Sequence, residues 1–285
     1  MSGNARDPGR STLDRVMTLL DVFDGTDLCL ADIVDRSGLP ITTAHRMLCA
    51  LEAWGGVERT PCGEYRIGTR LWQLGNLAAV PVSLRELAQP FLQDLYELTG
   101  ENVQLATRSG QHALVVERIS GSRAVPTVTR VGGLLPLHAT GVGKVLLAHA
   151  SPGLLMQLHH HGKLHRYTPY TLIMPGRLAA SLSKARTLGV ATAQEEMTLG
   201  TSSIAVPVID ASNSVQAAIG VVVHATTDAT RYTAALKTAA DLLSRRLKSS
   251  QVLLRSGARS QRTTARPPTS APEAAARTER SELTG

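Results

Sequence analysis

The chain has 285 residues, of which 43% are hydrophobic, 19% charged and 3% aromatic, with a formal net charge of +7 at pH 7. This length is enough for two domains, because one hydrophobic core usually serves about 100 to 200 residues. No apolar run reaches the roughly 18 to 20 residues of a membrane span, and the start, MSGNARDPGR, lacks the apolar segment of a signal peptide. We therefore expect a cytoplasmic protein with no membrane partner.

The positive charge is concentrated at the C-terminal end. Residues 1–70 contain eight basic and ten acidic residues, whereas residues 245–285 contain nine basic and three acidic residues. Bulk charge alone thus gives no support for a nucleic-acid site near the N-terminus. The three cysteines lack the paired short spacing of a zinc site, so the sequence favours reduced thiols and predicts neither a metal nor a cofactor.

Residues 11–68 have the pattern of three helices and a hairpin, after an N-terminus at 1–10 that we expect to be flexible. Apolar residues at helical spacing predict a helix capped by Thr12 and ending near Asp24, a second from Leu30 to Arg36, and a third with Pro40 in its first turn. Short strands are expected at 57–60 and 65–67. This order of elements is that of a winged helix-turn-helix DNA-binding domain.

The third helix has two different sides. An apolar side, expected to pack on the preceding helices, consists of Ala44, Met47, Leu48 and Leu51. The other side is polar, as in recognition helices that enter the major groove of DNA. We predict DNA contacts from Thr42, Thr43, His45 and Arg46, with phosphate contacts from Arg59 and Arg66 on the hairpin. An ordinary solvated helix face is the alternative.

A linker helix is expected at 69–81. It is apolar on nearly all sides, which predicts burial against a partner subunit, and Pro81 is expected to end it. Ser83 is then expected to cap a helix reaching about Thr99, and Pro90 is expected to kink that helix.

A second domain is expected at 82–252. Strands are predicted at about 103–107, 113–119, 125–130, 190–194, 202–209 and 215–224, and helices at about 141–150, 152–161, 176–188 and 228–250. Strand pairs between helices, without a βαβ repeat, predict an α+β fold whose antiparallel sheet is flanked by helices. After about Ser256 large apolar residues nearly disappear, so residues 253–285 are expected to form a disordered basic tail.

Three stretches of the sequence resemble one known family. LADIVDRSGLPITTAHRMLCALEAWGGVERT is similar to the DNA-binding segment of the IclR family, and GGLLPLHATGVGKVLLA and EEMTLGTSSIAVPV resemble its two effector-domain motifs. The resemblance covers about Thr12 to Leu247. It implies a transcriptional regulator, repressor or activator, with a GAF-like C-terminal domain. It also implies a homodimer or homotetramer that binds palindromic operator DNA and a small organic or aromatic acid.

An effector site is expected where a helix begins after Thr140, because free backbone N–H groups at a helix start can hold a carboxylate. Many family members have Cys where this chain has Ser203, and an acidic residue near Ala193 or Gln194. Hydroxyls that relatives place at the positions of Gly220 and Val222 are absent, which favours a larger or more apolar effector such as an aromatic acid. The implied effector-binding residues are Leu134, Gly141, Val142, Gln194, Ser203, Gly220 and Val222. Alternatively, 217–223 is simply a buried strand and the pocket lies elsewhere.

Other chemistries fit the sequence less well. The GVGK segment at 141–144 lacks the glycine separation and the following Ser or Thr of a phosphate loop. The histidines at 159, 160, 161 and 165 do not share one helix face, and Glu195 and Glu196 are expected to diverge at a strand end. No catalytic signature occurs, so we predict that the protein is not an enzyme. A ligand-sensing adaptor that acts through protein partners, or an enzyme on this fold, are the alternatives.

Overall fold

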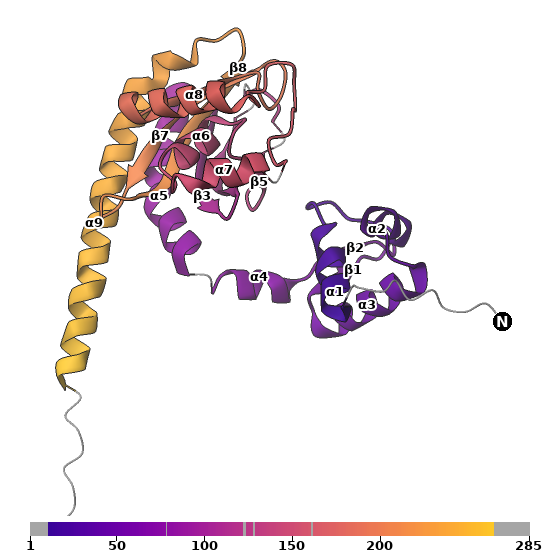
Figure 1. Ribbon diagram of the computed structural model, residues 1–285. Coiled ribbons are helices and arrows are strands. Elements are labelled where there is room, and N and C mark those ends of the chain that lie inside the picture. Colours follow the sequence, from indigo (N-terminus) through magenta and orange to yellow (C-terminus); the bar gives the residue numbers. More distant parts are fainter. Residues whose placement is uncertain (1–10, 78, 122–123, 128, 161, 265–285) are drawn as a thin grey trace, which may run out of the picture. The chain divides into compact units, whose positions relative to one another are not determined.

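The structure is a computed structural model that describes residues 11–77, 79–121, 124–127, 129–160 and 162–264. The chain divides into two compact units, Met1–Glu86 and Leu87–Gly285 (Figure 1). Each unit has its own hydrophobic core. The segment 1–10, predicted to be flexible, lies outside the described residues, as does 265–285 of the predicted tail.

Three helices and a two-stranded hairpin form the core of the first unit. They are α1 (Thr12–Asp21), α2 (Leu30–Ser37), α3 (Ile41–Trp54), β1 (Val57–Arg59) and β2 (Tyr65–Ile67). The strands pair antiparallel, and Val57 and Tyr65 point into the same core as the helices. This arrangement confirms the predicted winged helix-turn-helix fold.

Local chemistry sets the ends of these helices. Ser11, rather than Thr12, caps α1, because its hydroxyl accepts a hydrogen bond from the Asp14 N–H at 3.0 Å and the Asp14 carboxylate accepts one from the Ser11 N–H. Pro40 is the N-cap of α3 and not its first residue. Gly38 ends α2 with a φ of +65°, a left-handed conformation that glycine adopts without steric cost.

The stretch predicted as one linker helix contains a break. α4 (Thr69–Gly75) ends at Asn76, whose side-chain amide donates to the Trp72 carbonyl at 2.8 Å. α5 (Ala79–Thr99) begins before Pro81 and continues through Pro90. The prediction that Pro81 ends the linker was wrong, because Asn76 already competes for the last turn of α4. A proline in the first helical turn removes only an N–H that has no intrahelical partner.

A six-stranded antiparallel sheet with the order β5-β4-β3-β8-β7-β6 forms the centre of the second unit. Its strands are β3 (Asn102–Ser109), β4 (His112–Ile119), β5 (Leu134–Pro136), β6 (Ala191–Gln194), β7 (Thr201–Ile209) and β8 (Val215–His224). Gln104 lies opposite Gly220, and Val222 lies opposite Ser203. Because paired residues point the same way and side chains alternate along a strand, these four residues share one face of the sheet.

Helices cover both faces of this sheet (Figure 1). On the face of Gln104 lie α6 (Gly141–Ala148), α7 (Gly153–His160) and α8 (Pro175–Leu188), whose apolar side chains pack with Ala205 and Ala218 of the sheet. After a short 3-10 helix (Ala229–Tyr232), α9 (Thr233–Thr264) packs along β7, and its Ser244 hydroxyl accepts a hydrogen bond from the Ile209 N–H at 2.9 Å. This layering confirms the predicted α+β fold with an antiparallel sheet flanked by helices.

The strand predicted at 125–130 was wrong for the residues described there, since none of them belongs to a strand. Side chains hold this backbone in place of a sheet ladder: the Asn102 amide donates to the Val125 carbonyl at 2.7 Å, and the Arg118 guanidinium donates to the Thr129 carbonyl at 2.7 Å. The described residues of this stretch are therefore attached to the sheet through side-chain hydrogen bonds at Val125 and Thr129, without strand pairing.

Two further elements differ from the prediction. The short strand β5 was not predicted; it pairs with the outer edge of β4, where a proline such as Pro136 is tolerated. Residues 253–264 continue α9 and are not disordered as expected. In the part of the chain that the structure describes, no helix combines the length and apolar character needed to cross a membrane.

Candidate DNA-binding surface and effector cavity

The outward side of α3 is polar and open to solvent. Thr42, His45 and Arg46 are exposed and Thr43 is half-buried, whereas the predicted inward residues of this helix are buried. Among the described residues, the Arg46 guanidinium has no hydrogen-bond or ion-pair partner. The four residues predicted to contact DNA therefore lie together on one helix, with the arginine free to bind a group outside the protein.

The turn between α2 and α3 is fixed by short-range contacts. Gly38 turns the chain, and the Ser37 hydroxyl accepts a hydrogen bond from the Leu39 N–H at 3.3 Å. Leu39 itself is buried in the core of the first unit. The base of α3 is thus anchored on the core, which leaves its outward side as a rigid surface.

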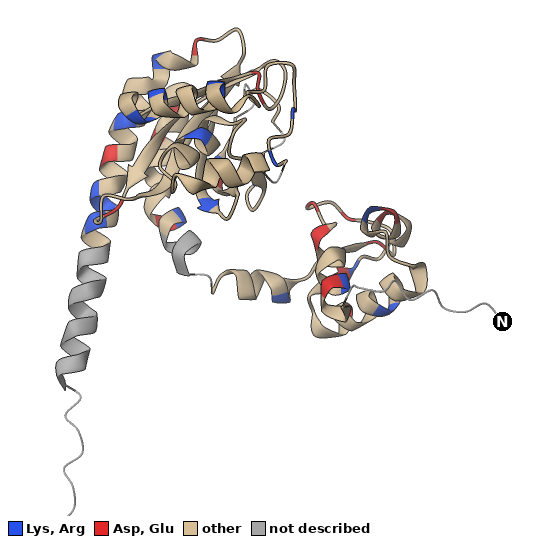
Figure 2. Ribbon diagram, viewed as in Figure 1, with Lys and Arg blue, Asp and Glu red and all other residues tan. Residues whose placement is uncertain are grey.

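The two arginines of the hairpin point to opposite faces of it. Arg59 lies opposite Tyr65 and stacks on its ring at 5.6 Å, whereas Arg66 lies opposite Glu58 and forms an ion pair with it at 3.3 Å. Because neighbouring residues on a strand alternate between faces, the two guanidinium groups do not share one surface. Both side chains are exposed, and basic and acidic residues are distributed over the whole unit (Figure 2).

A small cavity lies on the α6 side of the sheet in the second unit. It has a volume of about 30 Å³ and is lined by Gln104, Thr127, Thr129, Leu135, Ala139, Thr140, Ala193, Glu196, Met197, Thr198, Thr201, Ser203 and Val222. Most of the polar lining groups are hydroxyls, and no Lys or Arg is among these lining residues. Such a cavity has room for about two water molecules, so a larger ligand has to push its walls apart.

The predicted effector residues divide into two groups. Ser203 and Val222 line the cavity, and Gly141 adjoins it because its backbone N–H donates to Ser203 Oγ at 3.0 Å. Leu134 is 56% exposed, and Gln194 is exposed with its amide donating to the Ala225 carbonyl at 3.0 Å. Neither of these two side chains is part of the cavity lining.

Gly220 and Val142 contact each other beside the cavity. A Cβ atom on Gly220 would lie 2.9 Å from Val142 Cγ1 and 2.9 Å from the Ile204 carbonyl oxygen. The space above Gly220 is therefore filled by the protein's own valine. From the sequence, the missing hydroxyl at this position favoured a larger or more apolar effector. In the structure its absence leaves no open volume.

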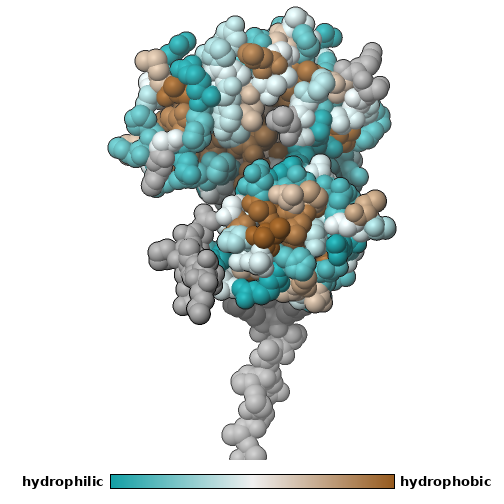
Figure 3. Space-filling view, turned by 90° about the vertical axis from the view of Figure 1, so that its right-hand side faces the viewer, coloured by the Kyte–Doolittle hydropathy of each residue, from teal (hydrophilic) through white to brown (hydrophobic). Residues whose placement is uncertain are grey.

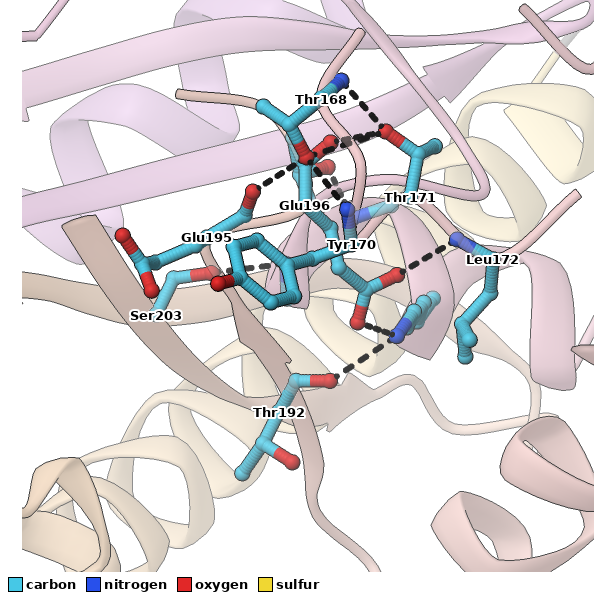
Figure 4. Close-up of polar contacts among 12 residues, drawn as sticks. Thr168, Tyr170, Thr171, Leu172, Thr192, Glu195, Glu196 and Ser203 are labelled. Atoms are coloured by element: carbon cyan, nitrogen blue, oxygen red, sulfur yellow. Dashed lines mark hydrogen bonds and ion pairs between the residues drawn. The ribbon is translucent and has the colours of Figure 1, made fainter. Parts of the chain in front are cut away.

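A buried ion pair holds Glu196, one of the residues that line the cavity. The ammonium group of Lys144 on α6 binds the Glu196 carboxylate and donates to the Thr192 carbonyl at 3.1 Å. The other oxygen of Glu196 accepts from the Leu172 N–H at 3.4 Å (Figure 4). Burial lowers the pKa of Lys144, and the nearby Glu196 carboxylate opposes that shift. The opposite charges of Lys144 and Glu196 cancel, so this part of the cavity lining has no net charge.

Glu195 and Glu196 diverge, as the sequence predicted. The Glu195 carboxylate accepts from the Gly200 N–H at 2.8 Å, within its own turn, while Glu196 points to Lys144. Hydroxyls from the preceding loop bind the backbone of this turn: Thr168 donates to the Glu195 carbonyl at 2.6 Å and Thr171 to the Glu196 carbonyl at 2.7 Å (Figure 4). The two carboxylates therefore do not form a shared catalytic pair.

Several lining residues were missed by the sequence reasoning, above all Gln104 and Thr127. The alternation of Val103 and Leu105 indicated that Gln104 faces the other side of its strand, but not what covers that side. The position of Thr127 depends on contacts made by Asn102 and Arg118, which no local pattern reveals. A glutamine between two apolar residues of a predicted strand was the one available signal.

A helix-turn-helix unit with an open polar α3, joined in one chain to a unit that encloses a hydroxyl-lined cavity, defines a class: transcriptional regulators with a DNA-binding domain and an effector-binding domain. The chain belongs to the IclR family of these bacterial regulators. The model of the IclR helix-turn-helix domain matches residues 12–61, and that of the bacterial transcriptional regulator IclR C-terminal domain matches residues 77–245.

Curated relatives are transcriptional regulators. The HTH-type transcriptional regulator XynR of Escherichia coli is 32% identical over 211 residues, which are 73% of this chain and 84% of XynR. The transcriptional repressor IclR of the same species is 30% identical over 197 residues, 68% of this chain and 72% of the repressor. Both are transcriptional regulators by name, which agrees with the predicted non-enzymatic role at the level of the family.

Solved structures agree with the fold. An IclR homolog from Microbacterium hydrocarbonoxydans, complexed with 4-hydroxybenzoate, superposes with a TM-score of 0.76 at 32% identity and covers 83% of this chain and 99% of its own. The Thermotoga maritima IclR superposes with a TM-score of 0.66 at 27% identity, covering 83% of this chain and 98% of its own.

Proposed function

We propose that the protein is a homo-oligomeric regulator whose affinity for operator DNA is switched by a small organic acid, of the aromatic class, bound in the cavity beside α6. The observation that carries this proposal is the contact between the Gly141 N–H and Ser203 Oγ, which joins the start of a helix to a cavity lined with hydroxyls. The carboxylate takes the place of Ser203 Oγ at the Gly141 N–H, and the hydroxyls of the lining donate to it, so it is held without a neighbouring cation.

DNA recognition is assigned to the outward side of α3. Its short hydroxyls, its imidazole and the unpaired guanidinium are the groups that read base edges in a major groove; they belong to Thr42, Thr43, His45 and Arg46. Arg59 and Arg66 point to opposite faces of the hairpin, so one of them supplies the phosphate contact of the wing and the other does not.

An aromatic acid is supported by two observations. The structural relative that is 32% identical was solved with 4-hydroxybenzoate bound. In this chain, Leu135, Ala139 and Val222 give the cavity an apolar side opposite its hydroxyls. An aromatic ring fits against such a side while its carboxylate is held by donors.

The size of the cavity provides the switch. At about 30 Å³ it cannot hold an aromatic ring, so binding has to displace the helix start, the turn at 195–200 or the segment near Thr127. A ligand that binds the widened state more tightly than the closed one shifts the balance between the two. The effector thereby alters the arrangement of the DNA-binding units in the oligomer.

Exposed apolar residues supply surface for self-association. Leu13 and Met17 lie one turn apart on α1 and are 62% and 53% exposed, and Trp72 on α4 is 69% exposed. Figure 3 shows apolar surface areas between polar ones on the face turned to the viewer. Apolar patches of this kind mark protein contacts.

The test is a mobility-shift titration of the full chain on the DNA upstream of its own gene, with and without 4-hydroxybenzoate and a panel of other acids. We expect one acid to change the operator affinity at least about fivefold. Ser203→Trp, which fills the cavity, should keep operator binding and lose this response, whereas Ser109→Trp at the exposed end of β3 should respond normally. An unchanged response in Ser203→Trp would place the effector elsewhere, and the absence of any specific DNA binding would refute the regulator itself.

A further inference from the structure

Two polar groups in the cavity have no hydrogen-bond partner among the residues that the structure describes. Gln104 is 3% exposed and lines the cavity, and its side-chain amide forms no hydrogen bond with any described residue. The Thr127 hydroxyl lines the same cavity, is buried, and also has no hydrogen-bond partner in the described part of the chain. A buried polar group without a hydrogen-bond partner is unfavourable, so a bound molecule that pairs these two groups gains affinity.

Thr127 is held on the same side of the cavity as Gln104. The segment around it is attached at two points, by Asn102 to the Val125 carbonyl and by Arg118 to the Thr129 carbonyl. Asn102 is two residues from Gln104 on β3, and Arg118 lies directly opposite Gln104 on β4. Thr127, between the two attachments, therefore lies over the β3–β4 side of the sheet.

Ser203 and the start of α6 lie at the other end of the cavity. Ser203 is on β7, and the strand β8 separates it from β3. Gln104 pairs with Gly220, and Ser203 pairs with Val222. Gln104 and Ser203 are therefore two strands apart and offset by two residues along the strand direction. With strands about 4.8 Å apart and residues about 3.3 Å apart along a strand, their Cα atoms are about 12 Å from each other.

The cavity thus has two polar ends. We propose that Gln104 and Thr127 form a second binding subsite that receives a hydroxyl group of the effector at the end opposite its carboxylate. This rests on the proposed function, in which the carboxylate binds near Ser203 and the start of α6. A hydroxyl suits this subsite because it both donates and accepts, and the Gln104 amide and the Thr127 hydroxyl do the same. The effector class is then a rod-shaped hydroxy acid with its two polar groups at opposite ends.

The spacing of the two polar ends supports this choice. Both side chains rise from the same face of the sheet, so their polar groups stay roughly as far apart as their Cα atoms, about 12 Å. A benzene ring that carries oxygen groups at opposite carbons spans a comparable distance once a hydrogen bond of about 2.8 Å is added at each end. Apolar Leu135, Ala139 and Val222 line the same cavity and offer contacts to the ring.

The test compares matched acids with and without the distal hydroxyl, by isothermal titration calorimetry on the full chain. The pairs are 4-hydroxybenzoate with benzoate, and 6-hydroxyhexanoate with hexanoate. We expect the wild type to bind the hydroxylated member of at least one pair about tenfold more tightly, which corresponds to one or two well-formed hydrogen bonds. Gln104→Leu and Thr127→Val should each reduce that ratio to about threefold or less, through weaker binding of the hydroxy acid and not of its partner.

Control variants isolate the effect of the subsite. Gln157→Leu on α7 and Thr187→Val on α8 make the same chemical changes at exposed positions and should keep the full ratio. Operator binding and the thermal unfolding midpoint without ligand show whether Gln104→Leu is folded, and Thr127→Val carries the test independently if it is not.

The outcomes separate this inference from the proposed function. Equal affinity for both members of a pair that binds, or a preference that persists in both variants, overturns the subsite and leaves the acid effector standing. No binding of any of the four acids overturns the subsite, and the operator titration with the wider panel of acids then decides the proposed function separately. A preference for the hydroxy acid that both variants lose supports both.

Discussion

The ammonium group of Lys144 and the carboxylate of Glu196 form a buried ion pair between α6 and the turn after β6. Removing one member leaves the other charge buried and unpaired. We expect Lys144→Met to lower the free energy of unfolding by about 3 to 5 kcal/mol. The double variant Lys144→Met with Glu196→Gln should recover much of this loss, because no uncompensated charge remains. Urea unfolding followed by circular dichroism measures both, and equal losses in the single and double variants would show that the ion pair is not the cause.

Gly220 allows Val142 to pack directly on the sheet. A Cβ at this position would lie 2.9 Å from both Val142 Cγ1 and the Ile204 carbonyl oxygen, so Gly220→Ala should destabilise the second unit by about 1 to 3 kcal/mol. Gly176→Ala on α8, where a Cβ meets nothing within 4 Å, is the matched control and should be neutral or stabilising by up to about 1 kcal/mol. Similar unfolding midpoints for the two variants would contradict this packing.

Some elements of the fold could be predicted from the sequence because local patterns determine them, and others could not because distant side chains hold them. On α3 the helical period alone identified Ala44, Met47, Leu48 and Leu51 as core, because a short amphipathic helix has one way to bury its apolar side. The residues around Thr127 alternate like a strand but are held by Asn102 and Arg118, and no local pattern distinguishes that support from strand pairing. The break at Asn76 likewise depended on a single side-chain hydrogen bond.

The sequence predicted the site residues that belong to a recognisable motif. It missed the residues that only the folded sheet brings to the cavity. Ser203 and the helix start at Gly141 belong to motifs that the family resemblance identified, and the structure places them in contact. Gln104 and Thr127 reach the same cavity only through the register of β3 with β8 and the contacts of the 124–130 segment. The missing side chain at Gly220 indicated open space beside the strand, but the neighbouring Val142 side chain occupies that space.

His138 provides a pH dependence of stability. Burial lowers its pKa below the ordinary value of 6.5, and this shift is opposed by a hydrogen bond to the His165 carbonyl at 2.9 Å; the charges of His165 and Lys144 add to the lowering. The unfolded chain therefore takes up a proton before the folded one does. The stabilisation is fully present above pH 6.5 and is lost as the pH falls toward the pKa of the folded state.

We expect the free energy of unfolding of the wild type to fall between pH 6.5 and 5.5 by up to about 1.4 kcal/mol more than that of His138→Gln. Urea unfolding at pH 7.5, 6.5 and 5.5 measures this difference. The glutamine amide can still donate to the His165 carbonyl but does not titrate. Parallel pH profiles of the two proteins would show that His138 titrates alike in the folded and unfolded states.

The most direct test of the account is operator binding by Arg46→Ala. Arg46 projects from the outward side of α3 and has no partner among the described residues, so its guanidinium is assigned to a base in the operator. In a mobility-shift titration at fixed salt on the DNA upstream of its own gene, Arg46→Ala should weaken binding by about 1 to 3 kcal/mol and affect a scrambled duplex less. Arg177→Ala, exposed on α8, should bind as the wild type does. Wild-type operator affinity in Arg46→Ala would contradict the assignment of α3 as the DNA-reading helix.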